Sequence, residues 1–179
     1  MKKSIKLFML LAVASLSASF ILFGDSQTEK STVEVESGKH AKKAFENAQK
    51  FYHNCESGKG WESVKAYVAE GAQFSVQAAA LAEITTVQGY VDWVAGLQIT
   101  APGNTYDLHA SAYDEENKSA LFFGTFTGTH SGDGGPVPPT NKTTNTHYVY
   151  VLKFNDSGKI VSMTKIWNAP WALKELGWM

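Results

Sequence analysis

The spacing of apolar residues changes near the middle of the chain. Residues 39–58 carry apolar side chains three and four positions apart, with lysines, Glu46 and Asn47 on the opposite face, which is typical of an amphipathic helix. The same reasoning predicts helices over 61–71 and 85–98, and the alternation within 72–77 predicts a short strand. The first half of the folded chain is therefore predicted to be mostly helical.

From residue 105 onward the apolar residues recur with a period of two, as they do in strands. Four such runs cover 105–114, 119–130, 146–154 and 159–168, and turn-like residues separate several of them. Strands joined by short turns pair antiparallel. Residues 169–179 are compatible with a short terminal helix. The predicted fold class is α+β, with a curved antiparallel sheet wrapped around about three helices to form a cone with a pocket.

The N-terminal segment has a different pattern from the rest. In residues 1–24, three lysines precede an apolar run that contains the small residues Ser17, Ala18 and Ser19, which is typical of a signal peptide for export to the periplasm or the medium. The alternative is an uncleaved membrane anchor, because the run is close to the roughly 20 residues that span a bilayer. Residues 25–39 are polar and predict a flexible linker. The folded domain is then expected over 40–179, with no membrane contact after removal of the leader.

Charge and composition exclude several classes of partner. The 179 residues carry a formal net charge of −1, and no cluster of basic residues follows the leader, so we expect no nucleic-acid partner. Cys55 is the only cysteine and lies at an apolar helical position, where a small buried residue is the simpler interpretation than a nucleophile. No glycine pattern for phosphate binding is present, so we expect no cofactor.

Histidines on three predicted strands, His109, His130 and His147, would form a zinc site only if their faces converged. No local ligand motif supports such a site, and we expect no metal.

Four short motifs in the second half indicate a family. They are GTHSG at 128–132, PPTNK at 138–142, GKI at 158–160 and IWN at 166–168. With the order of the elements, they resemble the SnoaL-like polyketide cyclases of the nuclear transport factor 2-like superfamily. The resemblance implies a small apolar carbonyl compound as ligand and a homodimer that pairs through the outer face of the sheet. It also implies an acidic general base, with the strand-end histidine at His130 steadying an enolate.

The acidic base of the family has no clear counterpart in this sequence. Relatives carry an aspartate either on the strand after the turn or beside a tryptophan of the last strand. Here 143–147 contains no acid, and the second position is Asn168, whose amide is not a base at neutral pH. Two functions therefore stay open: a cyclase- or isomerase-like enzyme, and a non-catalytic module that binds a ligand or partner. A carboxylate in the pocket would favour the enzyme.

The alternation of side chains along the predicted strand 119–130 supports the placement of His130 in the pocket. It shares a face with Phe122 and Phe126, and the glycines between them would leave room for a ligand. The alternative is an ordinary histidine exposed where the strand reaches solvent. On the next strand, His147 shares a face with Val149 and Val151, which favours the interior.

Three further residues are candidates for binding the ligand. Trp93 has an aromatic body with a polar tip. Asp92 could project into the mouth as a replacement acid, although the solvated face of its helix is the simpler placement. Asn168 could offer a hydrogen bond or simply end a strand. The predicted site thus has His130 and His147 as catalytic residues and Phe122, Phe126, Trp93, Asn168 and Asp92 as substrate-binding residues.

Overall fold

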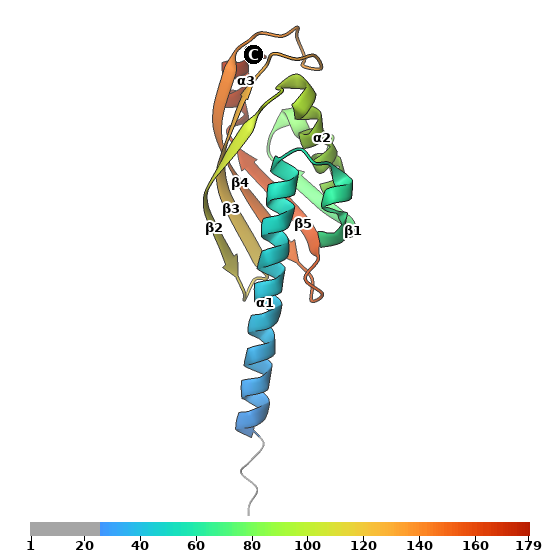
Figure 1. The fold of residues 1–179 in the computed structure, drawn as a ribbon, viewed down its shortest axis with the longest axis vertical. Coiled ribbons are helices and arrows are strands. Elements are labelled where there is room, and N and C mark those ends of the chain that lie inside the picture. Colours follow the sequence, from blue (N-terminus) through green and yellow to red (C-terminus); the bar gives the residue numbers. More distant parts are fainter. Residues whose placement is uncertain (1–25) are drawn as a thin grey trace, which may run out of the picture.

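A computed structural model of the chain describes residues 26–179, with side chains from residue 38 on. Three helices and five strands make up the fold (Figure 1). In chain order they are α1 (Ser26–Glu56), β1 (Val68–Val76), α2 (Val87–Thr100), β2 (Thr105–Asp114), β3 (Ser119–Thr129), β4 (Thr143–Phe154), β5 (Ile160–Trp167) and α3 (Ala169–Leu176). The fold class is α+β, as the sequence predicts.

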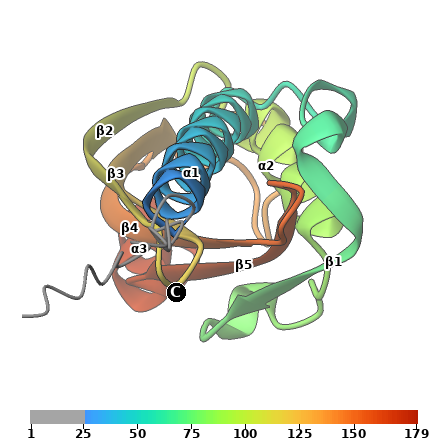
Figure 2. The same cartoon turned by 90° about the horizontal axis from the view of Figure 1, so that it is seen from below.

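The strands form one curved sheet in the order β1-β5-β4-β3-β2. The last four strands pair antiparallel with their neighbours in sequence, but β1 runs parallel to β5, so the sheet is mixed. Seen from below, the sheet curves around α1, with α2 closing the space beside it (Figure 2). This curvature makes the predicted cone.

The apolar face of α1 provides much of the core. Ala48, Phe51 and Tyr52 are completely buried against the sheet. The ring of Tyr52 stacks on Phe122 of β3, with 4.7 Å between the ring centroids and 10° between the planes. Each large side chain buried in this way stabilises the fold by about 1.5–3 kcal/mol, which is why the helix is held inside the sheet.

The prediction of a helix over 61–71 is wrong. The chain makes two short 3₁₀ turns, Trp61–Ser63 and Lys65–Tyr67, and then enters β1 at Val68. Val64 and Val68, which are four residues apart and both buried, fit a helical pattern equally well. Pairing with the distant strand β5 decides the outcome, and a local pattern does not contain that information.

The N-terminal predictions have different outcomes. Helix α1 begins at Ser26, within the segment that the sequence predicts as a linker. The predicted leader, residues 1–24, lies outside the described residues. Among residues 26–179, no helix combines the length and apolar character that crossing a bilayer requires.

Polar side chains define where helices α2 and α3 begin. The hydroxyl of Thr86 accepts a hydrogen bond from the backbone of Gly89 (3.1 Å) at the start of α2 and so caps that helix. The side chain of Asn168 accepts one from the backbone of Trp171 (3.2 Å) at the start of α3. These caps fix the two helices that line the cavity described below.

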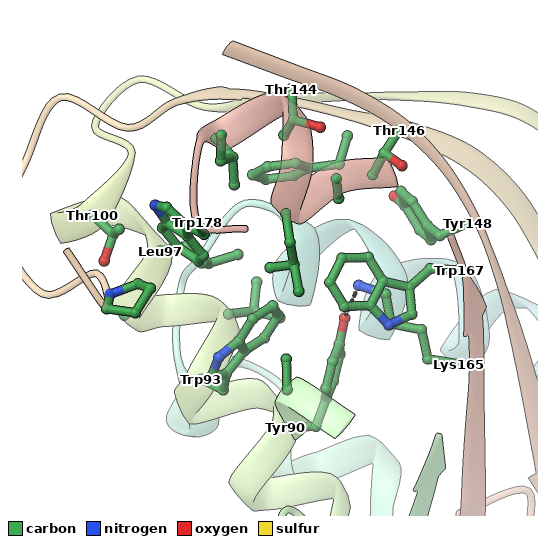
Figure 3. A pocket seen from close by; sticks show the side chains of 18 of the residues that line it. Tyr90, Trp93, Leu97, Thr100, Thr144, Thr146, Tyr148, Lys165, Trp167 and Trp178 are labelled. Atoms are coloured by element: carbon green, nitrogen blue, oxygen red, sulfur yellow. Dashed lines mark hydrogen bonds between the residues drawn. The ribbon is translucent and has the colours of Figure 1, made fainter. Parts of the chain in front are cut away.

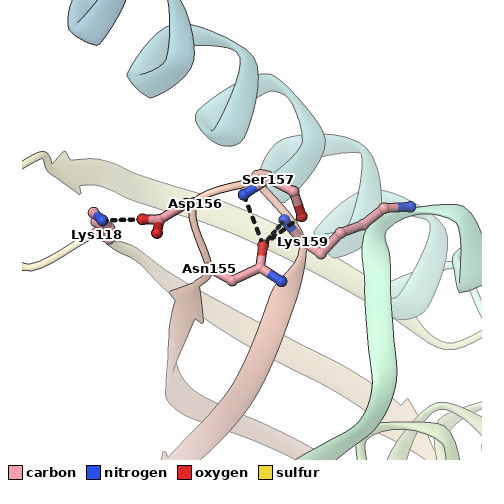
Figure 4. A network of polar contacts seen from close by, with 5 residues as sticks. All are labelled: Lys118, Asn155, Asp156, Ser157 and Lys159. Carbon is pink, nitrogen blue, oxygen red and sulfur yellow. Dashed lines mark hydrogen bonds and ion pairs between the residues drawn. The ribbon is translucent and has the colours of Figure 1, made fainter.

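The turn between β4 and β5 is held by side chains at the narrow end of the sheet (Figure 4). The amide oxygen of Asn155 accepts hydrogen bonds from the backbones of Ser157 (3.2 Å) and Lys159 (2.9 Å). Asp156 forms an ion pair with Lys118 of the neighbouring turn. At the other end of the sheet, Asn141 adopts a positive φ of 56°, as its side-chain type allows.

Candidate functional site

A cavity of about 760 Å³ lies between α2, α3 and the concave face of β3, β4 and β5. Its wall is mainly apolar, which suits a small organic molecule (Figure 3). Large apolar side chains of α2, of α3 and of the segment after α3 contribute to that wall: Trp93, Leu97, Ile99, Leu173, Leu176 and Trp178. Gly134 and Pro136 of the loop after β3 border it as well, so the Gly/Pro-rich segment forms part of its rim.

A carboxylate borders this cavity. Glu56, the last residue of α1, lines the cavity and is only 6% exposed. One of its oxygens accepts a hydrogen bond from the hydroxyl of Tyr148 (2.6 Å), and the other accepts one from Tyr150. Charge-assisted bonds of this kind compensate a carboxylate for the loss of water. The pocket therefore contains the acidic group that was not evident from the family motifs.

The hydroxyls around Glu56 are held in the protonated form. Burial, together with the negative charge of Glu56, raises the pKa of Tyr148, Tyr150 and Tyr90 well above the usual tyrosine range. Tyr52 adds a further hydroxyl, 2.7 Å from that of Tyr148. All four tyrosines can therefore donate hydrogen bonds at any pH near neutrality.

A lysine lies on the same side of the cavity. Lys165 of β5 lines the cavity with 8% of its surface exposed, and its ammonium donates a hydrogen bond to the hydroxyl of Tyr90 (2.7 Å). Five aromatic rings surround the nitrogen at 5.0–5.6 Å from their centroids: those of Tyr90, Trp93, Tyr148, Tyr150 and Trp167. Burial lowers the pKa of Lys165, and the charge of Glu56 opposes this shift.

Two tyrosines connect Lys165 with Glu56. No direct ion pair joins the two charges in the described part of the chain, but the hydroxyls of Tyr90 and Tyr150 lie 2.5 Å apart. The single hydrogen of Tyr150 is donated to Glu56, so Tyr90 must donate to Tyr150. Since Lys165 donates to Tyr90, every bond points the same way, from ammonium to carboxylate. A proton can be passed along such a chain.

Two polar atoms of the cavity wall lack a partner. The hydroxyl of Thr146 and the indole N–H of Trp167 are buried, and neither forms a hydrogen bond in the structure. Both residues line the cavity, and Figure 3 shows Trp167 beside Lys165 and Thr146 next to Tyr148. A buried polar group without a partner costs about 1–3 kcal/mol. A bound molecule with polar atoms would satisfy them.

The prediction of which face of β3 points to the interior is correct, but its glycines do not leave room for a ligand as predicted. Phe122, Gly124 and Phe126 all face the concave side, and Phe126 lines the cavity, as does Trp93. Phe122 instead lies fully buried beneath Tyr52 and is not a cavity residue. A Cβ on Gly124 would come within 2.6 Å of the Tyr52 hydroxyl, so the free space accommodates a protein side chain rather than a ligand.

His130 is not a cavity residue. It is fully buried, and its Nδ1 accepts a hydrogen bond from the indole of Trp178 (2.8 Å). The two rings meet edge to face at 5.0 Å. The other nitrogen, Nε2, faces Gly135, where a Cβ would come within 2.6 Å. His130 thus links the loop after β3 to the C-terminal segment, and the expected place at the mouth is taken by Trp178.

The remaining predicted residues lie outside the cavity. The placement of His147 in the interior is wrong: it is exposed on the outer face of β4, where its Nδ1 is 2.8 Å from the hydroxyl of Thr125. Both faces of β4 carry apolar residues, and the tyrosine face is the one that turns inward. Asp92 is exposed on the solvated face of α2, and Asn168 is exposed as the cap of α3.

Glu56 and Lys165 were missed although the sequence carries a signal for each. Glu56 lies four residues after Tyr52 and eight after Ala48, which places a charge on the apolar face of the helix. Lys165 alternates with Met163 and Trp167 on the inward side of β5. Charged residues on faces that are otherwise apolar are rare unless they have partners.

Comparison with known proteins agrees with the fold. The sequence model of the SnoaL-like polyketide cyclase family matches residues 46–176. A comparison with curated proteins finds no match.

Three solved structures illustrate the similarity of fold. AclR, a putative hydroxylase from Streptomyces galilaeus, is 16% identical with a TM-score of 0.62, and the match covers 78% of this chain and 98% of AclR. A putative SnoaL-like polyketide cyclase from Jannaschia is 13% identical, with a TM-score of 0.63 and coverage of 76% and 92%. IdmH, a putative polyketide cyclase from Streptomyces antibioticus, is 18% identical, with a TM-score of 0.61 and coverage of 75% and 98%.

Proposed function

Because the chain belongs to the SnoaL-like polyketide cyclase family, we propose that it is a cyclase- or isomerase-like enzyme that removes a proton next to the carbonyl group of an apolar compound. The observation that supports this most is the buried carboxylate of Glu56 at a mainly apolar cavity. General bases of this kind need a carboxylate within reach of the substrate and shielded from bulk water.

The proposed chemistry assigns a role to each charged group of the site. Glu56 takes the proton from the carbon next to the carbonyl, and an enolate forms. The ammonium of Lys165 donates one hydrogen bond to Tyr90, which leaves other N–H groups for the enolate oxygen. Stabilising that developing charge lowers the barrier to proton removal.

The unpartnered groups of the wall indicate what else the substrate carries. Thr146 can donate or accept a hydrogen bond, and the indole N–H of Trp167 can only donate. A substrate that satisfies both has an acceptor oxygen, such as a second carbonyl or an ether, beside its apolar body. The cavity volume of about 760 Å³ is sufficient for a molecule of several fused rings.

Hydrogen exchange on a model ketone tests the proposal. The protein is incubated in deuterated buffer with β-tetralone, and loss of the α-hydrogen signal is followed by proton NMR. Glu56→Gln keeps the size of the side chain but removes the base, so we expect exchange to slow by at least about a hundredfold. Glu46→Gln serves as the matched control, because Glu46 lies exposed on the same helix.

The same experiment separates the enzyme from the binding module. Binding of β-tetralone is measured independently by quenching of the cavity tryptophans. If the wild-type protein binds the ketone but exchanges its hydrogens no faster than buffer, the non-catalytic module is the correct function. Circular dichroism verifies that the Glu56→Gln protein is folded.

A further inference from the structure

The surroundings of Lys165 suggest more than a fixed positive charge. Its amine faces a cavity about 760 Å³ in volume, and no carboxylate among the described side chains pairs with it directly. A buried lysine kept only for structure usually has a direct acidic partner. Here the nearest polar partner is the neutral hydroxyl of Tyr90, at 2.7 Å.

The hydrogen-bonded chain from Lys165 to Glu56 supplies what an amine needs to become a nucleophile. The ammonium must lose a proton, and the bonds through Tyr90 and Tyr150 all point toward the carboxylate. Burial in apolar surroundings favours the neutral amine, and lysines of this kind form imines with carbonyl compounds. The five aromatic rings confine the nitrogen and keep bulk water away from it.

We propose that Lys165 is an amine nucleophile that forms an imine with an apolar aldehyde or ketone bound in the cavity, and that Tyr90, Tyr150 and Glu56 act as its proton relay. The inference rests on the proposed carbonyl ligand, but it assigns a covalent step that proton removal alone does not require.

The step balances without a further reactant. The ammonium of Lys165 passes one proton through the two hydroxyls to Glu56, and the free amine attacks the carbonyl carbon. A proton moves from nitrogen to oxygen to give the neutral carbinolamine. Glu56 then returns its proton through Tyr150 and Tyr90 to the hydroxyl of that adduct, and the C–O bond breaks. The products are a protonated imine on Lys165 and one water molecule.

An imine also makes proton removal easier. Its positive nitrogen withdraws electrons from the adjacent carbon more strongly than a neutral carbonyl does. The carboxylate of Glu56, at the other end of the relay, borders the same cavity. The two roles of Glu56, relay end and base, therefore follow one another in time.

Reductive trapping tests the proposal on the intact protein. The full chain is incubated near neutral pH with cinnamaldehyde, and separately with β-tetralone, in the presence of sodium cyanoborohydride. Peptide mass mapping should then find Lys165 heavier by the mass of the probe less one oxygen atom. Lys153 of β4 is exposed and provides the internal reference. We expect Lys165 to be labelled at least about tenfold faster than Lys153, because only the neutral amine reacts.

Two variants test the relay. Tyr90→Phe removes only a hydroxyl, so the fold should persist while labelling of Lys165 slows by about ten- to a hundredfold. Lys153→Met is the control and should leave the labelling of Lys165 unchanged. If Lys165 carries no label with either probe, or is labelled no faster than Lys153, the proposal is overturned. If Tyr90→Phe does not slow the labelling of Lys165, the proposed relay is overturned.

The outcome is independent of the hydrogen-exchange experiment. Exchange without a label on Lys165 would leave proton abstraction in place and exclude the imine. A label on Lys165 without exchange would establish the imine and exclude the proposed proton abstraction.

Discussion

Replacement of His130 by alanine should destabilise the fold rather than only weaken ligand binding. The imidazole is fully buried, it accepts the indole N–H of Trp178 at 2.8 Å, and it meets that ring edge to face at 5.0 Å. In His130→Ala all of these contacts disappear together. The C-terminal segment, which contributes Trp178 to the cavity wall, then keeps only the hydrogen bond from Thr140 to the carbonyl of Leu176 (2.6 Å) among its hydrogen bonds to the loop after β3.

The expected loss follows from two contributions. An indole N–H left without its partner costs about 1–3 kcal/mol. The aromatic contact adds about 0.5–1.5 kcal/mol. Together they predict that the free energy of unfolding falls by about 2–4 kcal/mol. For a chain of this size, that corresponds to a fall in melting temperature of roughly 5–15 °C.

Urea unfolding followed by far-UV circular dichroism measures this loss without relying on tryptophan fluorescence, which the substitution itself would change. Trp178→Phe keeps an aromatic ring but removes the donor, so a double-mutant cycle with His130→Ala isolates the pair. We expect a coupling energy of about 1 kcal/mol or more. A loss below about 0.5 kcal/mol, or strictly additive effects, would refute the structural role.

Three further substitutions test other parts of the structure. Gly132→Ala should lower the free energy of unfolding in urea by about 1–3 kcal/mol, because a Cβ there would overlap the carbonyl oxygen of Ile99. Gly96→Ala is the control and should have no such cost, because a Cβ at that position meets open space. Hydrogen bonds from β4 lower the pKa of Glu175, so its contribution to stability is present above the ordinary glutamate pKa and lost as the pH falls through the lowered value. Glu175→Gln should therefore be less stable than wild type at pH 7 in urea unfolding, and the difference should shrink as the pH falls below the ordinary glutamate pKa of about 4.3. Phe123→Glu, on the outer face of the sheet, should convert the expected homodimer to a monomer in analytical ultracentrifugation, and an unchanged mass would exclude that face as the interface.

Local patterns predicted most of the strands and helices of this fold. The strand predicted over 105–114 coincides with β2. The strand predicted over 119–130 is one residue longer than β3 at one end, and that over 159–168 is one residue longer than β5 at each end. The alternation of apolar and polar residues is a strong signal in these strands, because one face of each strand is buried and turn residues mark its ends. The helix predicted over 61–71 was wrong, because the spacing of apolar residues within that segment carries no information on parallel pairing with a distant strand.

The site was predicted less well than the fold, for a physical reason. Phe126 was placed at the cavity by the periodicity of its own strand, and Trp93 was named for its aromatic body with a polar tip. The burial of Glu56 and Lys165 could not be predicted from either residue alone. A charge on an apolar face is stable only when hydrogen-bonded partners compensate it, and those partners are not adjacent in sequence. Those partners, Tyr90 and Tyr150, come from two further elements. Contacts between four segments that are distant in sequence cannot be derived from any one of them.

The order of synthesis has a consequence for when this protein can act. Glu56 ends α1 and is therefore synthesised before Lys165, which lies on β5. The intervening tyrosines must also reach their places before the two charges are joined. A nascent or C-terminally truncated chain that ends before β5 therefore carries a carboxylate without the lysine at the other end of its hydrogen-bonded chain. The amine that we propose at this cavity would therefore become competent only once β5 has been synthesised and has packed beside the tyrosines.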